Sequence, residues 1–347
     1  MFRAFSALFL LTHVAVGQIA TNQIQLTHNE AAKSVVVTVD GKPFTAYIYP
    51  GPTVLKKPVL YPIVSSGGNP ITRGWPLNPR PGERVDHPHH VGMWFNYGDV
   101  NGHDFWNNST SVGPEHKGPF GTIVHAGVTA MKSGAGRGEL TVTANWLDKD
   151  GVPMLRETTR YIFEATASER TIDRITTLTA LGKDVLFKDN KEGLIAVRVA
   201  RELEHPSTKP EVFTDAKGVA TAVPMLNNDG VTGRYVSSEG AVGDAVWGTR
   251  AGWVNLTGII NGETVSVVLL DHPRNVGYPT YWHARGYGLY AANSLAPSIF
   301  SNGKAPAMNK SLSAGQSMTF QHRLVIASET LAEPAVAKRA ASFGSRR

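Results

Sequence analysis

The sequence predicts an all-β fold, a large single-domain β-sandwich with long ordered loops. Short runs in which apolar and polar residues alternate recur along most of the chain. Turn residues separate these runs, among them many of the 35 glycines and 21 prolines. No long segment shows the 3.6-residue period of an amphipathic helix. Strands at short spacing, with no helices between them, are typical of a sandwich.

The predicted strands follow one another from the N-terminal third to the end of the ordered region. Residues 24–50 alternate around Asp40-Gly41, and residues 251–272 alternate around Asn261-Gly262; both dipeptides are hairpin signals. Residues 125–165 give three more runs, separated by glycine-rich and Asp-Gly turns. Residues 172–181 and 317–328 each supply one further strand.

The two ends of the chain differ from this pattern. In residues 1–17 one arginine precedes a short apolar run, and small residues follow at the expected cleavage positions, which is the pattern of a secretory signal peptide. We therefore expect a secreted or periplasmic protein with no membrane span after signal cleavage. Residues 18–329 would form the sandwich, and residues 330–347 would form a basic, disordered tail.

Composition excludes several classes of function. The chain has no cysteine, which excludes a cysteine nucleophile and leaves its stability to the hydrophobic core. The formal net charge is +6, but outside the tail basic and acidic residues alternate, so we expect no nucleic-acid partner. The sequence also lacks GxSxG, GxGxxG, Walker and HExxH motifs.

The stretch RVDHPHHVGMWFNYGDVNGHDFW, which begins at Arg84, concentrates ionisable and aromatic side chains. The six prolines between residues 62 and 88 predict a long ordered loop before and within it, a common place for function. Imidazoles serve as acids, bases and metal ligands, and aromatic rings stack on the C–H face of a sugar. The candidates from this part of the chain are Arg73, Arg80, Asp86, His87, His89, His90, Trp94, Asp104 and Trp106.

Two later segments add further candidates. Glu192 precedes an alternating strand in which Arg198 could pair with a carboxylate. Residues 271–297 again combine histidine, arginine and aromatic residues, and the candidates there are Trp282, His283 and Arg285. Because this composition is close to that of the first stretch, we expect the two segments to form two walls of one cleft.

These residue types favour a protein that binds a carbohydrate or another small polar ligand. We expect His87, His89 or His90 to act with Glu192 or His283 as acid and base. The arginines would orient a hydroxyl, carbonyl or carboxylate group of the ligand. Epimerase, lyase and hydrolase chemistry stay open. The alternatives are a divalent-metal site in which His87, His89 and one of Asp86, Asp104 and His283 are ligands, and a non-catalytic sugar-binding module.

Three segments carry a resemblance to a known family. Residues 61–106, residues 189–200 and residues 272–296 with the closing strand after Gly315 resemble the bacterial "PmoA-like" family, also called methane oxygenase PmoA. The segment SLSAGQSMTFQHRLVIAS is similar to the closing strand of galactose-mutarotase-like proteins. That similarity implies a β-supersandwich whose concave sheet binds a sugar through histidines, an arginine and a carboxylate.

Overall fold

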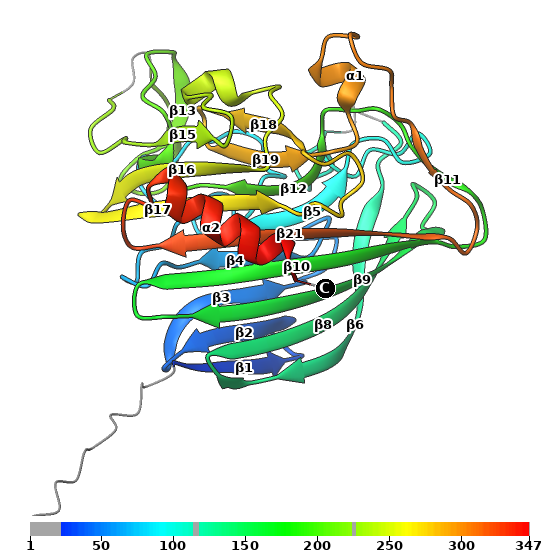
Figure 1. Cartoon of the computed structure of the whole chain (residues 1–347), viewed down its shortest axis with the longest axis horizontal. Coiled ribbons are helices and arrows are strands. Elements are labelled where there is room, and N and C mark those ends of the chain that lie inside the picture. Colours follow the sequence, from blue (N-terminus) through cyan, green and yellow to red (C-terminus); the bar gives the residue numbers. More distant parts are fainter. Residues whose placement is uncertain (1–21, 114–117, 224–226, 347) are drawn as a thin grey trace, which may run out of the picture.

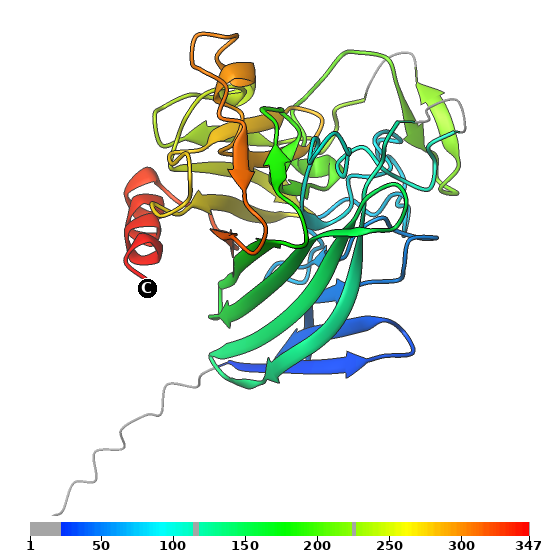
Figure 2. The ribbon, with the colours of Figure 1, turned by 90° about the vertical axis from the view of Figure 1, so that its right-hand side faces the viewer.

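The computed structural model describes residues 22–113, 118–223 and 227–346. Two large antiparallel sheets dominate it (Figures 1 and 2). The predicted all-β sandwich is confirmed. The predicted signal peptide lies outside the described residues.

The first sheet has nine strands. Their order across the sheet is β18 (Tyr281–Arg285), β19 (Leu289–Asn293), β12 (Gly193–Arg198), β5 (Met93–Tyr97), β4 (Val59–Ile63), β3 (Lys42–Ile48), β2 (Ser34–Val39), β1 (Gln23–Asn29) and β7 (Gly134–Ala135).

The second sheet has eight strands. Their order is β15 (Arg234–Ser237), β16 (Trp253–Ile260), β17 (Glu263–Asp271), β21 (Ser317–Ala327), β10 (Glu169–Ala180), β9 (Pro153–Ala165), β8 (Arg137–Leu147) and β6 (Thr122–Lys132).

Small elements complete the chain. Two small two-stranded sheets pair β11 (Val185–Phe187) with β20 (Lys310–Leu312) and β13 (Glu211–Thr214) with β14 (Ala220–Val223). The helical elements are η1 (Arg201–Leu203), η2 (Gly243–Val246), α1 (Pro297–Phe300) and α2 (Glu333–Gly344). No helix in the described part of the chain is long and apolar enough to cross a membrane.

Two hairpins form where the sequence predicts them. Asp40 and Gly41 connect β2 to β3, and Asn261 and Gly262 connect β16 to β17. All four residues have positive φ, between 49° and 81°. A two-residue hairpin whose central residues both have positive φ matches the twist of the strands, and asparagine, aspartate and glycine tolerate that conformation best. Both predicted turns are therefore confirmed.

Alternation along the strands separates an inner core from two outer clusters. On β5, Met93, Phe95 and Tyr97 belong to the core between the sheets, whereas Trp94 lies in a cluster on the outer face of the nine-stranded sheet. This outer cluster contains Val59, Val91, Trp94, Trp106, Ala196, Leu289 and Ala291. Since successive side chains of a strand point to opposite faces, one strand supplies side chains both to the core and to the outer cluster.

The predicted disordered tail is wrong, because residues 333–344 form helix α2. Figure 1 shows α2 lying across the outside of the eight-stranded sheet. Val336 and Phe343 are buried there with residues of β17 and β21. Arg339 pairs with Glu169 at 2.6 Å. The basic residues of this segment are thus partly used to fix the helix on the sheet.

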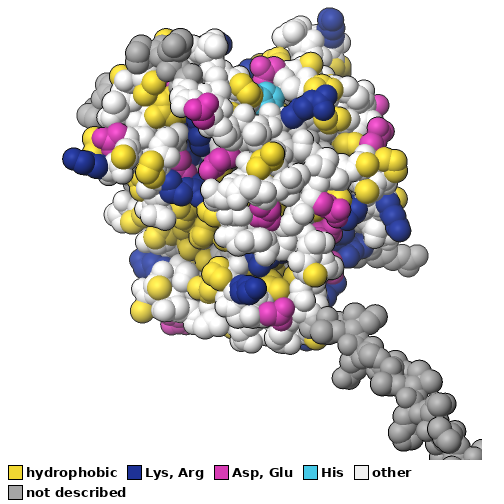
Figure 3. All heavy atoms as spheres, turned by 90° about the vertical axis from the view of Figure 1, so that its left-hand side faces the viewer, with side chains coloured by type: hydrophobic (Ala, Val, Ile, Leu, Met, Phe, Trp, Pro, Cys, Tyr) yellow, Lys and Arg dark blue, Asp and Glu magenta, His cyan; other side chains and the backbone are white. Residues whose placement is uncertain are grey.

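Charged side chains of both signs are interspersed on the face shown in Figure 3.

Candidate functional site

The candidate site lies on the outer face of the nine-stranded sheet, at β18, β19, β12 and β5. One row of cross-strand partners runs from His283 through Ala291 and Ala196 to Trp94. The two alanines leave space above the centre of the sheet, and the ring of Trp106 lies there, 5.3 Å from Trp94 and 6.5 Å from His283 between centroids. This register places the first and third segments on neighbouring strands of one sheet face; that they form two walls of one cleft stays a prediction.

The segment before β5 is anchored to this surface by two buried arginines. Nη1 and Nη2 of Arg73 donate to the carbonyl oxygens of Arg84, Asp86, His87 and His90. Arg198 of β12 donates from Nη2 to Asp86 Oδ1 at 2.6 Å, and Nη1 of Arg73 donates to the same oxygen at 2.5 Å. The expected pairing of Arg198 with a carboxylate is therefore confirmed.

These contacts determine the charge of Asp86. Burial alone would raise the pKa of this carboxyl, but Arg198, the hydrogen bond from His87 and Arg73 together hold the pKa well below its usual range. Asp86 is consequently a carboxylate at any physiological pH. Its second oxygen, Oδ2, lies 2.9 Å from Nδ1 of His87.

His87 is the exposed member of the histidine group. Its side chain is 41 % exposed. Its ring stacks on His90 at 4.8 Å and on Tyr287 at 5.1 Å, with interplanar angles of 1° and 4°. The backbone of His87 has φ +43°, which is uncommon for a residue other than glycine. Three partners thus hold the ring in one orientation, while its Nε2 edge carries no hydrogen bond within the described part of the chain.

His89 and His90 lie deeper than His87. The ring of His90 stacks on Trp94 at 5.1 Å. Burial, with the neighbouring charges, lowers the pKa of His90 well below its usual value and that of His89 to about 2. Both imidazoles are therefore neutral at neutral pH. They support the ring of His87 and do not titrate in the range where an acid–base catalyst works.

Glu192 and His283 form a second polar pair on the same face. Oε2 of Glu192 lies 3.6 Å from Nδ1 of His283. Burial, followed by the charge of Lys191, lowers the pKa of His283 to about 3. His283 is thus a neutral imidazole beside a carboxylate, and Lys191 pairs with that same carboxylate.

Several predicted ligand-binding residues have structural roles instead. Trp282 is buried in the core between the sheets and donates from Nε1 to the carbonyl of Ala251, which corrects its assignment to the site. Arg80 pairs with Glu83 at 2.7 Å and donates to the carbonyl of Thr72, so it fixes the loop. These donors are occupied by the protein itself.

Four further residues that were expected to bind a ligand also have structural roles. Arg73 is 1 % exposed and has no free face for a ligand. Asp104 accepts hydrogen bonds from the backbone of Trp106 and from Asn107, which makes it the cap of a turn. Trp94 and Trp106 are 0 % and 1 % exposed, so they are packing residues and not a sugar platform.

A cavity of about 400 Å³ lies next to this group of residues. Tyr287, which stacks on His87, lines it, and so do Arg285 and Trp247; the guanidinium of Arg285 lies 4.8 Å from the centre of the Trp247 ring. The remaining lining residues are Arg84, His205, Pro206, Ser207, Lys209, Glu211, Asp244, Ala284 and Gly286. Polar groups of both signs and two aromatic rings therefore face one space.

Sequence reasoning missed part of this cavity. Asp244 lies in the 3₁₀ segment η2, and Trp247 directly follows it. No cluster of titratable residues marks that segment in the sequence. Glu204, which receives hydrogen bonds from Arg84 and Arg201, was also missed. The turn at residues 204–206 contacts the turn after β18 through the hydrogen bond from His205 N to the carbonyl of Gly286, a pairing across about 80 residues of sequence.

The arrangement of the described residues does not support the alternative of a divalent-metal site. Within the described ranges, no three histidine, cysteine, aspartate or glutamate side chains are arranged to hold a metal ion. Nδ1 of His87 faces Asp86, and the buried Nε2 of His89 has no hydrogen-bond partner in the described part of the chain.

The comparisons with known proteins give a family but no activity. A model described as a family of unknown function (DUF6807) matches residues 34–341. No curated protein matches the chain in sequence. The name "PmoA-like" does not appear in the matching description, so the resemblance seen in the sequence is confirmed only as membership of an uncharacterised family.

Two solved structures are similar in shape at low identity. One is a protein of Escherichia coli provisionally described as an aldose 1-epimerase, with 10 % identity, a TM-score of 0.34, and coverage of 88 % of this chain and 99 % of the other. The second is the GH36 α-galactosidase AgaA of Geobacillus stearothermophilus, with 10 % identity, a TM-score of 0.38, and coverage of 88 % and 41 %. A likeness this remote carries no argument about activity.

Proposed function

The chain belongs to this family of unknown function, and from its site we propose that Asp86 and His87 form an acid–base centre acting on a small carbohydrate-type ligand. The observation that carries the proposal is the geometry of His87. Its Nδ1 is held at 2.9 Å from Asp86, its ring is fixed by two parallel neighbours, and its side chain is 41 % exposed.

This geometry fits proton transfer. Asp86 as acceptor selects the tautomer of His87 that carries hydrogen on Nδ1, which leaves the Nε2 lone pair free to take a proton. When Nε2 takes that proton, the carboxylate of Asp86 stabilises the imidazolium ion. The buried arginines 73 and 198 keep Asp86 ionised throughout this cycle.

The backbone of His87 supports a functional origin for this arrangement. A non-glycine residue with φ near +43° is strained by about 1–3 kcal/mol, and such strain gathers at functional sites. Asparagine or glycine would relieve the strain at this position. A histidine at this strained position therefore indicates that its side chain has a function.

Glu192 with His283 is the proposed second group. The pair lies on the same outer face, since His283 is in the row of partners that ends at Trp94. Acid–base chemistry on a sugar needs one group to accept a proton and one to donate it. A neutral imidazole beside a carboxylate is suited to hold a ligand hydroxyl or to pass a proton.

The adjoining cavity supports a sugar or a similar polyol as the ligand. Its volume of about 400 Å³ is that of an ordinary small-molecule pocket. Tyr287 and Trp247 offer ring surfaces, and the charged side chains around them offer donors and acceptors for hydroxyl groups. The signal-like pattern in residues 1–17 supports export as part of the same proposal.

Proton NMR of purified protein mixed with a panel of sugars and glycans in deuterated buffer tests the proposal. An isomerase exchanges a C–H proton or speeds anomer interconversion, a lyase produces unsaturated sugar signals, and a hydrolase produces new anomeric signals. The variant His87→Asn, which tolerates a left-handed backbone, should lose the reaction, whereas the control His103→Asn should keep it. Binding without any reaction would instead assign a non-catalytic sugar-binding module.

A further inference from the structure

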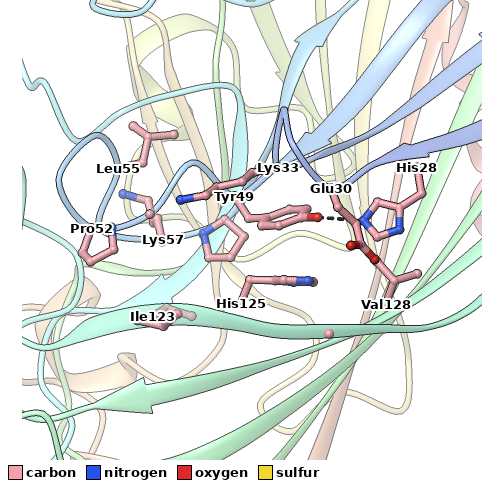
Figure 4. A pocket seen from close by; sticks show the side chains of 14 residues that line it. His28, Glu30, Lys33, Tyr49, Pro52, Leu55, Lys57, Ile123, His125 and Val128 are labelled. Carbon is pink, nitrogen blue, oxygen red and sulfur yellow. Dashed lines mark hydrogen bonds between the residues drawn. The ribbon is translucent and has the colours of Figure 1, made fainter.

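A second cavity, of about 690 Å³, lies between β1, β3, β6 and the segment of residues 51–58 (Figure 4). Its lining shares no residue with the 400 Å³ cavity beside His87. The lining residues are His28, Glu30, Lys33, Tyr49, Gly51, Pro52, Leu55, Lys57, Pro58, Ile123, Val124, His125, Gly127 and Val128. The predicted site included none of them.

Hydrogen-bonded rings form a rigid wall in this cavity. Nε2 of His28 lies 2.7 Å from the hydroxyl of Tyr49, the contact dashed in Figure 4. Nδ1 of His125 lies 3.0 Å from the hydroxyl of Tyr47, and the ring of His125 stacks on Tyr49 at 3.9 Å between centroids. His28, Tyr47 and His125 lie on β1, β3 and β6, strands of both sheets, and Tyr49 directly follows β3, so the wall is fixed by the fold.

Lys57 is held in this cavity at an energetic cost. The residue is 4 % exposed, and its Nζ donates to the carbonyl of His89 at 2.7 Å. No carboxylate in the described part of the chain lies within ion-pair distance of it. Its Nζ lies 5.4 Å from the centre of the Trp94 ring, and the charge of Asp104 offsets the cost of burial only in part. Burying an ammonium group without a direct ion pair is unfavourable, so stability alone does not account for a lysine at this position.

Lys33, which also lines this cavity, has an unfavourable backbone conformation. Its φ is +50°, in the left-handed region, where glycine or asparagine would be more stable by about 1 kcal/mol. The ammonium group of Lys33 contacts the carbonyl of Pro50 at 3.3 Å, and it too has no ion-pair partner among the described residues. Figure 4 shows both lysine side chains at the same side of the cavity, beside Pro52.

We propose that this cavity is a second ligand site, in which Lys33 and Lys57 bind the carboxylate of a small hydroxylated acid such as a sugar acid. An anion supplies the direct ion-pair partner that neither ammonium group has in the described part of the chain. It also accounts for two lysines being kept at positions where other residues would stabilise the chain.

The rest of the lining favours hydroxyl groups on the same ligand. Glu30 is the one carboxylate among the lining residues, and Figure 4 shows it close to His28 and His125. Burial, followed by the charge of His28, lowers the pKa of His125 to about 4, so its imidazole is neutral. A neutral imidazole and a carboxylate suit ligand hydroxyls, and with two lysines the lining keeps a net positive charge.

Isothermal titration of the exported chain with D-glucuronate and with D-glucose, in mildly acidic buffer, tests this site. The wild type should bind glucuronate with one-to-one stoichiometry and at least tenfold more tightly than glucose. Lys33→Asn relieves the backbone strain and removes the charge, so it should weaken glucuronate binding about tenfold without loss of stability. Lys57→Met should weaken binding similarly, and Lys149→Met, at an exposed turn, should leave it unchanged.

Three results would overturn the proposal: no glucuronate binding by the wild type, equal affinity for glucose, or full affinity in a folded Lys33→Asn variant. The His87→Asn variant separates this site from the acid–base centre. It should bind glucuronate normally even though it lacks the proposed activity. If His87→Asn abolishes glucuronate binding, the anion binds beside His87 and the second site is refuted.

Discussion

Arg198 and Asp86, which are 112 residues apart in the sequence, meet at 2.6 Å on the outer face of the nine-stranded sheet. This ion pair joins β12 to the histidine-bearing loop and, together with Arg73, fixes the carboxylate that orients His87. The position of the proposed acid–base centre therefore depends on an ion pair between two segments that are far apart in the sequence.

Replacing Arg198 by methionine should destabilise the protein strongly. Arg198 is fully buried, and its loss leaves the partly buried carboxylate of Asp86 with one arginine fewer, for which about 3–5 kcal/mol is expected. Urea unfolding measures the loss. Arg137→Met is the matched control, because Arg137 pairs with Glu139 in an exposed position and its loss should cost less than about 1 kcal/mol. Similar costs for the two variants would contradict the anchoring role.

Trp106→Ala should lower the free energy of unfolding by about 3–5 kcal/mol. The ring is buried between Trp94 and His283, so truncation opens a cavity in the outer cluster. The expected change is in the free energy of unfolding, measured by chemical denaturation. A stable variant that has lost only ligand binding would show that Trp106 contacts the ligand after all.

Removing residues 333–347 should lower the free energy of unfolding by roughly 3–6 kcal/mol, because Val336 and Phe343 leave apolar surface of β17 and β21 uncovered. Thermal unfolding of the shortened chain measures this. The single change Phe343→Ala should reproduce most of the effect, whereas Lys338→Ala, on the exposed side of α2, should not. An unchanged melting temperature would mean that the helix does not dock on the sheet.

The buried side chain of Lys57 should make the stability of the protein depend on pH. Burial, opposed in part by Asp104, lowers the pKa of Lys57 to about 7, whereas the unfolded chain has the ordinary value near 10.5. Between these values the unfolded state carries one more proton, so stability should rise with pH. The slope is about 1.4 kcal/mol per pH unit at most.

The difference in unfolding free energy between the wild type and Lys57→Met isolates this contribution. The wild type should gain relative to the variant as the pH rises from about 7 towards 10. A difference that does not change with pH would show that Lys57 keeps its ordinary pKa in the folded protein.

Local sequence patterns predicted the sheets well. Alternation and the dipeptides Asp40-Gly41 and Asn261-Gly262 identify hairpins because strand period and turn conformation are local properties. Helix α2 was missed, although Val336 and Phe343 are spaced as neighbours on one helix face. Its tail is rich in alanine and basic residues, and only docking on the sheet gives it a buried side.

The candidate site was predicted in part. Asp86, His87, Glu192 and His283 lie on one face of the sheet. They could be predicted because they stand in segments of the sequence that are rich in ionisable and aromatic residues. Trp282 was misplaced, since which face of a strand a tryptophan occupies depends on the register with its neighbours. Lys57 and Lys33 were not recognised, because a lone lysine carries no signal until its burial and its backbone conformation are known.

The central claim is that His87 is a proton-transfer group and not a packing residue, and the His87→Asn variant tests it most directly. Its catalytic rate on the substrate found by NMR, and its free energy of unfolding, should be measured on the same preparation. The account predicts a rate at least about 100-fold below that of the wild type, with unfolding changed by less than about 1 kcal/mol. A variant that keeps the wild-type rate, or one that loses activity only because it unfolds, would contradict the claim.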